Sequence, residues 1–296
     1  MPSFIPSELK TARLYGYLLG AVAPRPICFA STVSAKGKVN LAPFSFFNVF
    51  SAKPPIMIFS PSRRGRDNTL KHTLENVQEV KEVVINIVSY AMVQQMSLAS
   101  TEYPKGVNEF VKAGFTEVAS HTVTPPRVKE APVQFECAVK DIIPLGTHGG
   151  AGNLVLCEVV KLHVAASVLD ENEAIDPHKI DTVSRLGGNW YCRASRGLFE
   201  VPGPPRVPGM GVDALPHNIK NSKVLSGNNL GMLATIGALP TADKINTFVA
   251  GVRDTDSYVI TSGSEAERHE RAKQYLDKGR VTDAWCILLA KPLAGN

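Results

Sequence analysis

The sequence predicts a mainly β protein, a β-barrel with α additions, followed by a C-terminal helical extension. Short apolar segments bounded by Gly, Pro, Ser or Asn fill most of residues 26–161, and this texture is typical of barrel strands. Helical patterns interrupt them without regular strand-helix alternation, which argues against a doubly wound parallel sheet. A proline-rich stretch near residue 201 then separates these segments from a region with helical patterns.

Five segments of the first region carry the strand pattern, because they are apolar, rich in β-branched residues and closed by turn residues. They cover residues 27–33, 55–60, 83–88, 133–143 and 154–164. We expect them to form the barrel.

Three short helices are expected between these strands. Leu70, Leu74 and Val77 recur at helical spacing, and Asp67 or Asn68 is suited to the N-cap of a helix that starts there. The other two helices are expected over residues 91–100 and over residues 108–113, before Gly114.

The domain boundary is placed where Pro202, Pro204, Pro205 and Pro208 fall close together, because such a stretch cannot hold regular structure. This gives a barrel domain over residues 1–201 and a helical extension over residues 202–296. In the extension, residues 217–238 have a largely helical pattern. A capping box runs from Ser264 to Glu267 and opens a helix that Gly279 can close.

Composition narrows the possible partners. The net charge of +5 is spread along the chain, and no helix-turn-helix, finger or RNA-binding signature accompanies it, so no nucleic acid is expected. No stretch approaches the roughly 20 apolar residues of a membrane helix, so no membrane is expected either. The five scattered cysteines include no CxxC pair, which favours reduced thiols and a cytoplasmic location.

Two windows suit a phosphate-bearing planar ligand. Residues 61–69 place serine, threonine and three arginines directly before the expected helix, where helix N–H groups and arginines favour an anion. Residues 40–48 mix phenylalanines with small polar residues, as the wall of a flat-ring pocket would. The plainer alternatives are a solvated arginine loop and ordinary core phenylalanines.

A series of short motifs gives these windows a context. Each is weak alone, but their ordered succession resembles the flavin reductase-like, FMN-binding split-barrel family, which includes flavoredoxin, over about residues 15–200. The motifs are Arg25-Pro26-Ile27, Asn40 to Asn48, Pro54 to Ser60, Arg66 to Thr69, Glu82 to Asn86, Asn108 to Phe110, and Arg185 to Tyr191.

The resemblance implies FMN as the cofactor and no required catalytic side chain, since a flavin supplies the chemistry itself. It assigns ring and ribityl contacts to Ser45, Phe46, Phe47 and Asn48, and ribityl or phosphate contacts to Ser60 and Ser62. It assigns phosphate contacts to Arg66, Asn68 and Thr69, and adds Arg185 from the later motif.

Two departures from the family limit this transfer. Where the family often has Lys-Asp-Thr, this chain has Arg66-Asp67-Asn68-Thr69, which leaves open whether Asp67 or Asn68 faces the ligand. Where many members have a His followed four residues later by Gly-Glu-Val, this chain has Asn153 and then Cys157-Glu158-Val159. Any role of that His is not carried over.

Other chemistry-bearing residues receive plainer interpretations. His148 lies in the glycine-rich stretch 146–152, a turn between strands that lacks the Lys-Ser/Thr ending of a P-loop. No metal site is expected, and Glu136, Asp141 and Glu158 are read as barrel-surface carboxylates. Cys28, Cys137 and Cys157 are read as inert core residues.

The expected function is that of an FMN-binding oxidoreductase, which passes electrons from NAD(P)H or a protein donor through bound FMN to an acceptor. By the resemblance, a homodimer with the flavin near the subunit interface is also expected. Two alternatives stay open. One is a non-catalytic, flavoredoxin-like electron carrier, and the other is a split-barrel module that binds another phosphate-bearing ligand.

Overall fold

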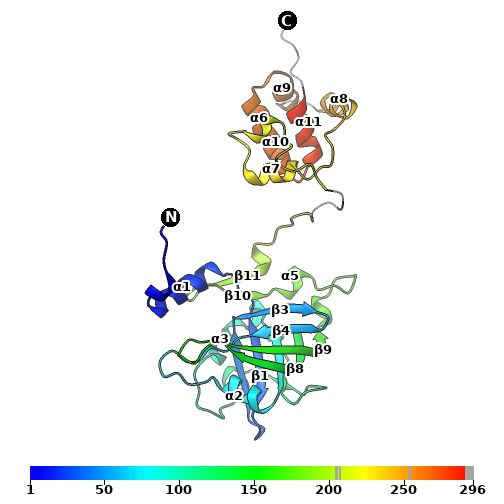
Figure 1. The fold of residues 1–296 in the computed structure, drawn as a ribbon. Helices are drawn as coiled ribbons and strands as arrows, with labels where there is room; N and C mark the ends of the chain where they lie inside the picture. Colours follow the sequence, from blue (N-terminus) through cyan, green and yellow to red (C-terminus); the bar gives the residue numbers. More distant parts are fainter. Residues whose placement is uncertain (204–205, 207, 253–254, 291–296) are drawn as a thin grey trace. The chain divides into compact units, whose positions relative to one another are not determined.

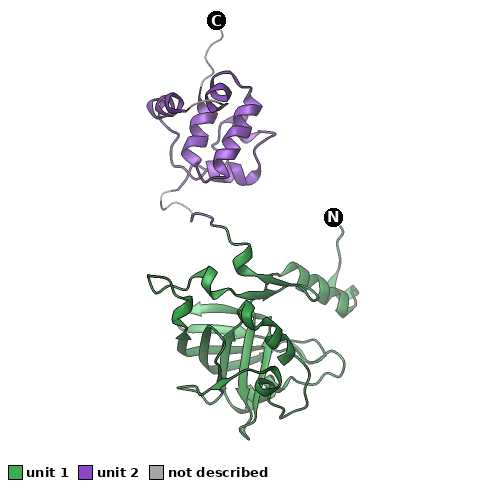
Figure 2. Ribbon diagram, turned by 180° about the vertical axis from the view of Figure 1, so that it is seen from behind, with its two compact units in different colours: residues 1–199 green, residues 200–296 purple. Residues whose placement is uncertain are grey.

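The computed structural model describes residues 1–203, 206, 208–252 and 255–290. The chain divides into two parts, unit 1 over Met1–Phe199 and unit 2 over Glu200–Asn296 (Figure 2). Of the prolines at the predicted boundary, Pro204 and Pro205 lie outside the described residues. Each unit has its own hydrophobic core, so each is described by itself.

Unit 1 is built on a seven-stranded sheet in the order β2-β1-β5-β8-β9-β4-β3, with every neighbouring pair antiparallel (Figure 1). The strands are β1 (Cys28–Val33), β2 (Val39–Phe44), β3 (Phe47–Ala52), β4 (Pro55–Phe59), β5 (Glu82–Ile87), β8 (Val133–Pro144) and β9 (Asn153–Val164). The five predicted strands are confirmed. Strands β2 and β3 were missed, because residues 40–48 lack a clean apolar-polar alternation.

Position in the sheet explains the sequence of its strands. Every residue of β1 is buried, and β1 lies between β2 and β5 with apolar clusters on both sides. Phe29 belongs to one cluster and Cys28 to the other, as expected for successive side chains on opposite faces. Two residues at the free edge, Val49 and Phe50 of β3, are instead exposed.

Helices and short hairpins complete unit 1. The helices are α1 (Thr11–Ala21), α2 (His72–Glu79), α3 (Val93–Ala99), α4 (Glu109–Ala113) and α5 (Pro177–Ile180), with 3-10 turns at Pro6–Glu8, Tyr90–Met92, Ala166–Val168 and Ala194–Arg196. The hairpins pair β6 (Glu117–Val118) with β7 (Arg127–Val128), and β10 (Val183–Arg185) with β11 (Tyr191–Arg193).

The helices predicted over residues 91–100 and 108–113 are confirmed as α3 and α4. At α4 the Asn108 side chain accepts a hydrogen bond from the Phe110 N–H at 2.9 Å. Gly114 then ends the helix with φ 71°, a left-handed conformation that glycine adopts without steric cost.

Unit 2 is helical and packs around Trp285, whose indole N–H donates to the Leu233 carbonyl at 3.0 Å. Its helices are α6 (His217–Lys220), α7 (Gly227–Leu233), α8 (Ala242–Gly251), α9 (Thr255–Ser262), α10 (Glu265–Leu276) and α11 (Val281–Leu289). The Ser264–Glu267 capping box is confirmed. The largely helical pattern predicted over residues 217–238 corresponds to two short helices, α6 and α7, because a second capping box at Ser226 starts α7 as a separate helix.

The predicted fold class, mainly β with α additions and a C-terminal helical extension, is confirmed. Across the described residues, every helix is too short or too polar to span a bilayer.

Candidate functional site

The arginine loop, residues 63–69, was predicted to run directly into a helix, and this prediction is wrong. Helix α2 begins only at His72, after Lys71 in extended conformation, so neither Asp67 nor Asn68 is its N-cap. The loop instead closes on itself, because the Arg64 N–H donates to the Thr69 carbonyl and the Asn68 N–H to the Arg64 carbonyl, both at 2.9 Å. An anion at this loop would therefore meet side chains and loop amides rather than a helix N-terminus.

Asn68 is the residue that shapes this loop. It has φ 58°, in the left-handed region that asparagine tolerates better than most residues. Its side-chain oxygen accepts from Nε of Arg63 at 2.6 Å, and its amide nitrogen donates to the Thr147 carbonyl at 3.0 Å. The Asn68 amide thus joins two loops and does not line the neighbouring cavity.

Asp67 is the other residue that could face the ligand in place of Asn68. Its carboxylate accepts hydrogen bonds from both the side chain and the backbone N–H of Thr69, at 2.6 and 3.1 Å. Those bonds, with a further one from Arg66, lower the pKa of Asp67 to about 2. Arg66 also pairs with Glu102 at 2.7 Å while its side chain is 68% exposed. A phosphate would therefore meet Arg66 and Thr69 in competition with two carboxylates.

A surface cavity of about 390 Å³ opens beside this loop, and we call it the arginine-loop cavity. Arg64, Arg66 and Thr69 line it together with Glu102 and Tyr103. Arg64 serves the loop, since it donates to Thr69 Oγ1 at 3.1 Å and also bonds the Leu70 carbonyl. Arg66 is thus the more accessible guanidinium for a ligand.

The glycine-rich segment 146–152 is a loop between β8 and β9, which confirms the predicted turn. It packs on the arginine loop through two backbone hydrogen bonds, from Arg63 N–H to Ala151 O at 2.8 Å and from Gly150 N–H to Arg63 O at 3.0 Å. A Cβ at Gly149 would lie 3.0 Å from the Arg64 carbonyl oxygen, and one at Gly152 only 2.6 Å from Ser60 Oγ. These glycines allow the close approach.

The predicted ring-binding residues 45–48 lie in different environments: a cavity, the core and the exposed surface. Ser45 lines a cavity. Phe46 contacts Tyr15 edge to face with ring centroids 6.2 Å apart, and its carbonyl accepts from Ser60 N–H at 2.8 Å. Phe47 packs on the core cluster beneath the sheet, and Asn48 is exposed on β3.

The cavity beside Ser45 measures about 330 Å³, and we call it the hairpin cavity because the β10–β11 hairpin closes one side. Arg185 on β10 lines it, and its guanidinium lies over the Tyr191 ring at 4.5 Å from the centroid. From the motif 185–191 only Arg185 was assigned to the ligand, and the lining residues Asn189 and Tyr191 were missed. Ser97 and Ser100, near the end of α3, were also missed.

Arg25 holds this hairpin in place. Its backbone pairs with that of Arg185 through two hydrogen bonds of 2.8 Å. Its buried guanidinium donates to Leu19 O at 2.6 Å and Leu186 O at 2.9 Å, and also bonds the Val22 carbonyl. One side chain thus ties the end of α1 to the hairpin.

The structure therefore brings the predicted residues into two groups. Ser45 and Arg185 share the hairpin cavity, whereas Arg66 and Thr69 share the arginine-loop cavity. Both cavities border one short stretch of chain, since Met96, Ser97 and Ser100 line the first and residues 102–104 line the second. Ser60 and half-buried Ser62 lie at the end of β4, where the arginine loop begins.

Elsewhere one interpretation is corrected. Glu136 is not a barrel-surface carboxylate, because it is fully buried and accepts hydrogen bonds from several neighbours. By contrast, Asp141 is exposed as expected. Cys28, Cys137 and Cys157 are buried in one core cluster, where burial raises the pKa of each thiol.

The match to a known family lies within unit 1. The sequence model of the flavin reductase like domain matches residues 20–179. An uncharacterized protein of Aquifex aeolicus is 41% identical over 191 residues, which is 64% of this chain and 95% of that protein.

Two solved structures are similar in fold. Nitrilotriacetate monooxygenase component B from Bacillus cereus is 31% identical and has a TM-score of 0.64, covering 68% of this chain and 98% of its own. A Shewanella frigidimarina protein described as having a split barrel domain is 24% identical with a TM-score of 0.58, covering 67% of this chain and 96% of its own. The predicted split barrel is thereby confirmed.

Proposed function

Because the chain belongs to the flavin reductase-like family, we propose that unit 1 binds FMN and passes electrons through it from NAD(P)H to an acceptor. The observation that carries this proposal is the pairing of the two cavities along residues 96–104. FMN has a flat ring at one end and a phosphate at the other. A mixed apolar and polar cavity next to an arginine-bearing one suits those two ends.

The residues present fit the cofactor. The hairpin cavity offers aromatic and apolar walls from Phe44, Met96 and Tyr191 beside the polar groups of Ser45 and Arg185. Its volume of about 330 Å³ lies within the usual range for small-molecule sites, roughly 300–1,000 Å³. We assign the ring to this cavity and the phosphate to the arginine-loop cavity.

Each proposed residue then has a definite task. Arg66 and Thr69 would hold the phosphate, and Ser60 and Ser62 would bind the ribityl chain between the two ends. Ser45 and the backbone near Phe46 would contact the ring edge, with Arg185 beside it. Phe47 and Asn68 would position their neighbours rather than touch the ligand, because the first packs in the core and the second bridges two loops.

Bound FMN supplies hydride acceptance and electron transfer, so no acid or base side chain is assigned. The Bacillus cereus protein that is 31% identical to this chain is component B of nitrilotriacetate monooxygenase. We therefore propose that the electrons taken up by the acceptor are used by a separate protein component. The proposal also keeps the cytoplasmic location that the scattered cysteines favour.

We further propose a homodimer. Val49 and Phe50 are exposed by 65% and 63% on the edge strand β3, and burying them against a second copy would remove apolar surface from water. Sedimentation equilibrium of the purified chain would give twice the monomer mass if this is correct, and the monomer mass if it is not.

The first experiment is a visible absorption spectrum of the purified, untagged chain, repeated after anaerobic addition of NADH or NADPH. A yellow protein that bleaches supports the reductase proposal. A yellow protein that resists both nicotinamides would identify an electron carrier with a protein donor. A colourless protein that cannot be reconstituted with FMN would leave the binding of another phosphate-bearing ligand as the function.

The assigned phosphate contact is tested by Arg66→Ala. A lost charge-assisted hydrogen bond costs about 1.5–3 kcal/mol, so the dissociation constant of FMN should rise about tenfold or more. Arg280→Ala is the matched control, since Arg280 is a half-exposed arginine of unit 2 that pairs with Asp283. Equal affinity of both variants would reject the assignment of the phosphate to the arginine loop.

A further inference from the structure

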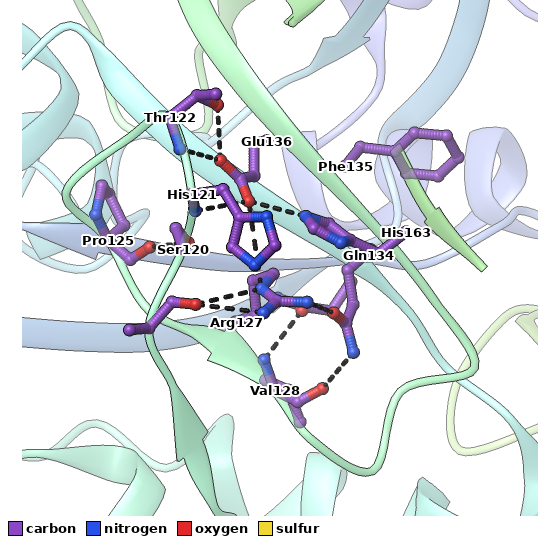
Figure 3. A network of polar contacts seen from close by, with 12 residues as sticks. Ser120, His121, Thr122, Pro125, Arg127, Val128, Gln134, Phe135, Glu136 and His163 are labelled. Carbon is purple, nitrogen blue, oxygen red and sulfur yellow. Dashed lines mark hydrogen bonds and ion pairs between the residues drawn. The ribbon is translucent and has the colours of Figure 1, made fainter. Parts of the chain in front are cut away.

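A second cluster of ligating side chains lies in unit 1 away from both cavities. It consists of His121 in the loop between β6 and β7, Glu136 on β8 and His163 on β9. None of the three lines the hairpin cavity or the arginine-loop cavity. Figure 3 shows both imidazole rings next to the Glu136 carboxylate.

The distances are close to those of a metal site. The nearest ligating atoms of the three side chains all lie within 4.8 Å of one another. Nε2 of His163 is 2.6 Å from Oε1 of Glu136, and the two rings are nearly perpendicular with centroids 4.9 Å apart. A tetrahedral zinc ion with bonds near 2.1 Å places its ligands about 3.4 Å apart. Side-chain movements of about 1 Å would therefore suffice.

The carboxylate is already held in the orientation that a ligand needs. Oε2 of Glu136 accepts from the Thr122 N–H at 2.6 Å and from the Thr122 hydroxyl. Oε1 accepts from the His121 N–H at 2.9 Å and faces both imidazoles. Such outer contacts fix ligating carboxylates in known metal sites.

Two cations oppose a metal ion here. Nε of Arg127 lies 3.9 Å from Oε1 of Glu136, and the positive charge of Lys161 lowers the pKa of His121. The guanidinium of Arg127 is itself held by the Ala119 carbonyl at 3.0 Å and by Gln134 at 3.0 Å. Its charge lowers the affinity of the cluster for a metal cation.

We propose that His121, Glu136 and His163 form a binding site for a divalent transition metal such as Zn²⁺. Two imidazoles and one carboxylate are the ligands that zinc takes when one coordination position stays open to water. His121 is exposed to solvent, which leaves that position accessible. The metal would replace the hydrogen bond between His163 and Glu136, and the Nε2 proton of a neutral His163 would move by way of solvent to Nδ1, which frees Nε2 for the metal.

A bound metal ion would link the β6–β7 loop to strands β8 and β9. The loop is now fixed to β8 by hydrogen bonds from His121 and Thr122 to Glu136. A metal ion would add a bond from the His121 side chain and one from β9, and so would favour the folded state by mass action.

The test is a titration of the untagged, EDTA-treated full chain with Zn²⁺ by calorimetry, with Co²⁺ absorption as a second readout of the ligand geometry. We expect one equivalent of Zn²⁺ and visible Co²⁺ bands. His121→Ala removes an exposed ligand with little risk to the fold and should weaken binding at least tenfold. His178→Ala is the matched control, because His178 is an exposed histidine on α5 outside the cluster.

A second variant, His163→Ala, tests the buried side of the site and should lose binding as well, with circular dichroism reporting whether it folds. Loss in His121→Ala with full binding in His178→Ala supports the site. Absence of Zn²⁺ binding in the parent chain, or unchanged binding in His121→Ala, overturns it and leaves the cluster as a hydrogen-bonded ion pair only.

Discussion

The two units of the chain use buried polar groups in different ways. In unit 1 the buried polar side chains join separate strands and loops, as Asn86 does by bonding both Phe29 O and Val128 N. In unit 2 fewer polar side chains are buried among the described residues: the Trp285 indole N–H satisfies one helix carbonyl, and buried His269 forms a hydrogen bond with Ser222. The difference shows that the sheet depends on polar ties for its loops, whereas the helices depend mainly on apolar packing.

The largest expected effect separates the two cores. Trp285→Ala in unit 2 and Phe59→Ala in unit 1 each remove a fully buried aromatic ring, which should cost about 3–5 kcal/mol of folding free energy. Peptide-resolved hydrogen exchange should show faster exchange only in the unit that carries the substitution. Equal acceleration in both units by either variant would mean that they unfold as one.

A smaller effect tests the polar ties of unit 1. Asn86→Ala leaves Phe29 O and Val128 N without their buried partner, at a cost of about 1–3 kcal/mol. The urea midpoint should fall for this variant and stay near the parent value for Asn172→Ala, an exposed asparagine of the same unit. An unchanged midpoint for Asn86→Ala would remove the distinction between the units.

Removing one helix N-cap should cost about the same folding free energy in each unit. Ser264→Ala and Asn108→Ala each remove a side chain that accepts from a helix N–H, and each should cost about 0.5–2 kcal/mol. Hydrogen exchange should rise at the start of α10 in the first variant and of α4 in the second. A rise outside the affected unit would contradict local action of the caps.

The smallest expected effect is the loss of folding stability as the pH falls. Burial lowers the pKa of His269 in unit 2, so the unfolded chain binds a proton first and stability is lost as the pH falls below about 6.5. In unit 1 the hydrogen-bonded Glu136 has a pKa of about 2, so its contribution is lost only below about pH 4.5. Between pH 7 and 5.5, His269→Gln should therefore lose less stability than the parent chain.

Fluorescence can follow this in unit 2 alone. Trp285 is buried there, and Trp190 of unit 1 is 77% exposed, so a Trp190→Phe background leaves one reporter. Urea midpoints that fall equally with pH in the His269→Gln and parent chains would exclude His269 as the cause.

The sequence was most informative where local pattern and tertiary position agree. The five predicted strands and the Ser264 capping box depend on neighbouring residues, and all are confirmed. Strand β3 was missed because its edge position leaves Val49 and Phe50 exposed, which removes the alternation that marks a half-buried strand.

The candidate site was less predictable because tertiary contacts decide its details. Asn68 carried a cap signal, but its side chain is taken by Arg63 and by Thr147, which is 79 residues away. Glu136 is contacted by a distant loop, whose His121 and Thr122 N–H groups donate to its carboxylate. Neither contact has a signature at short range, so both residues were assigned to the wrong environment.

The close approach of Gly149 and Gly152 to the arginine loop also limits how the chain can vary. Alanine at position 152 needs only a rotation of the Ser60 side chain, whereas alanine at position 149 meets backbone atoms that cannot rotate away. The segment after β4 and the segment after β8 can therefore change in length or bulk only together. Exchanging either one alone between related proteins would disturb the other, even though about 80 residues separate them.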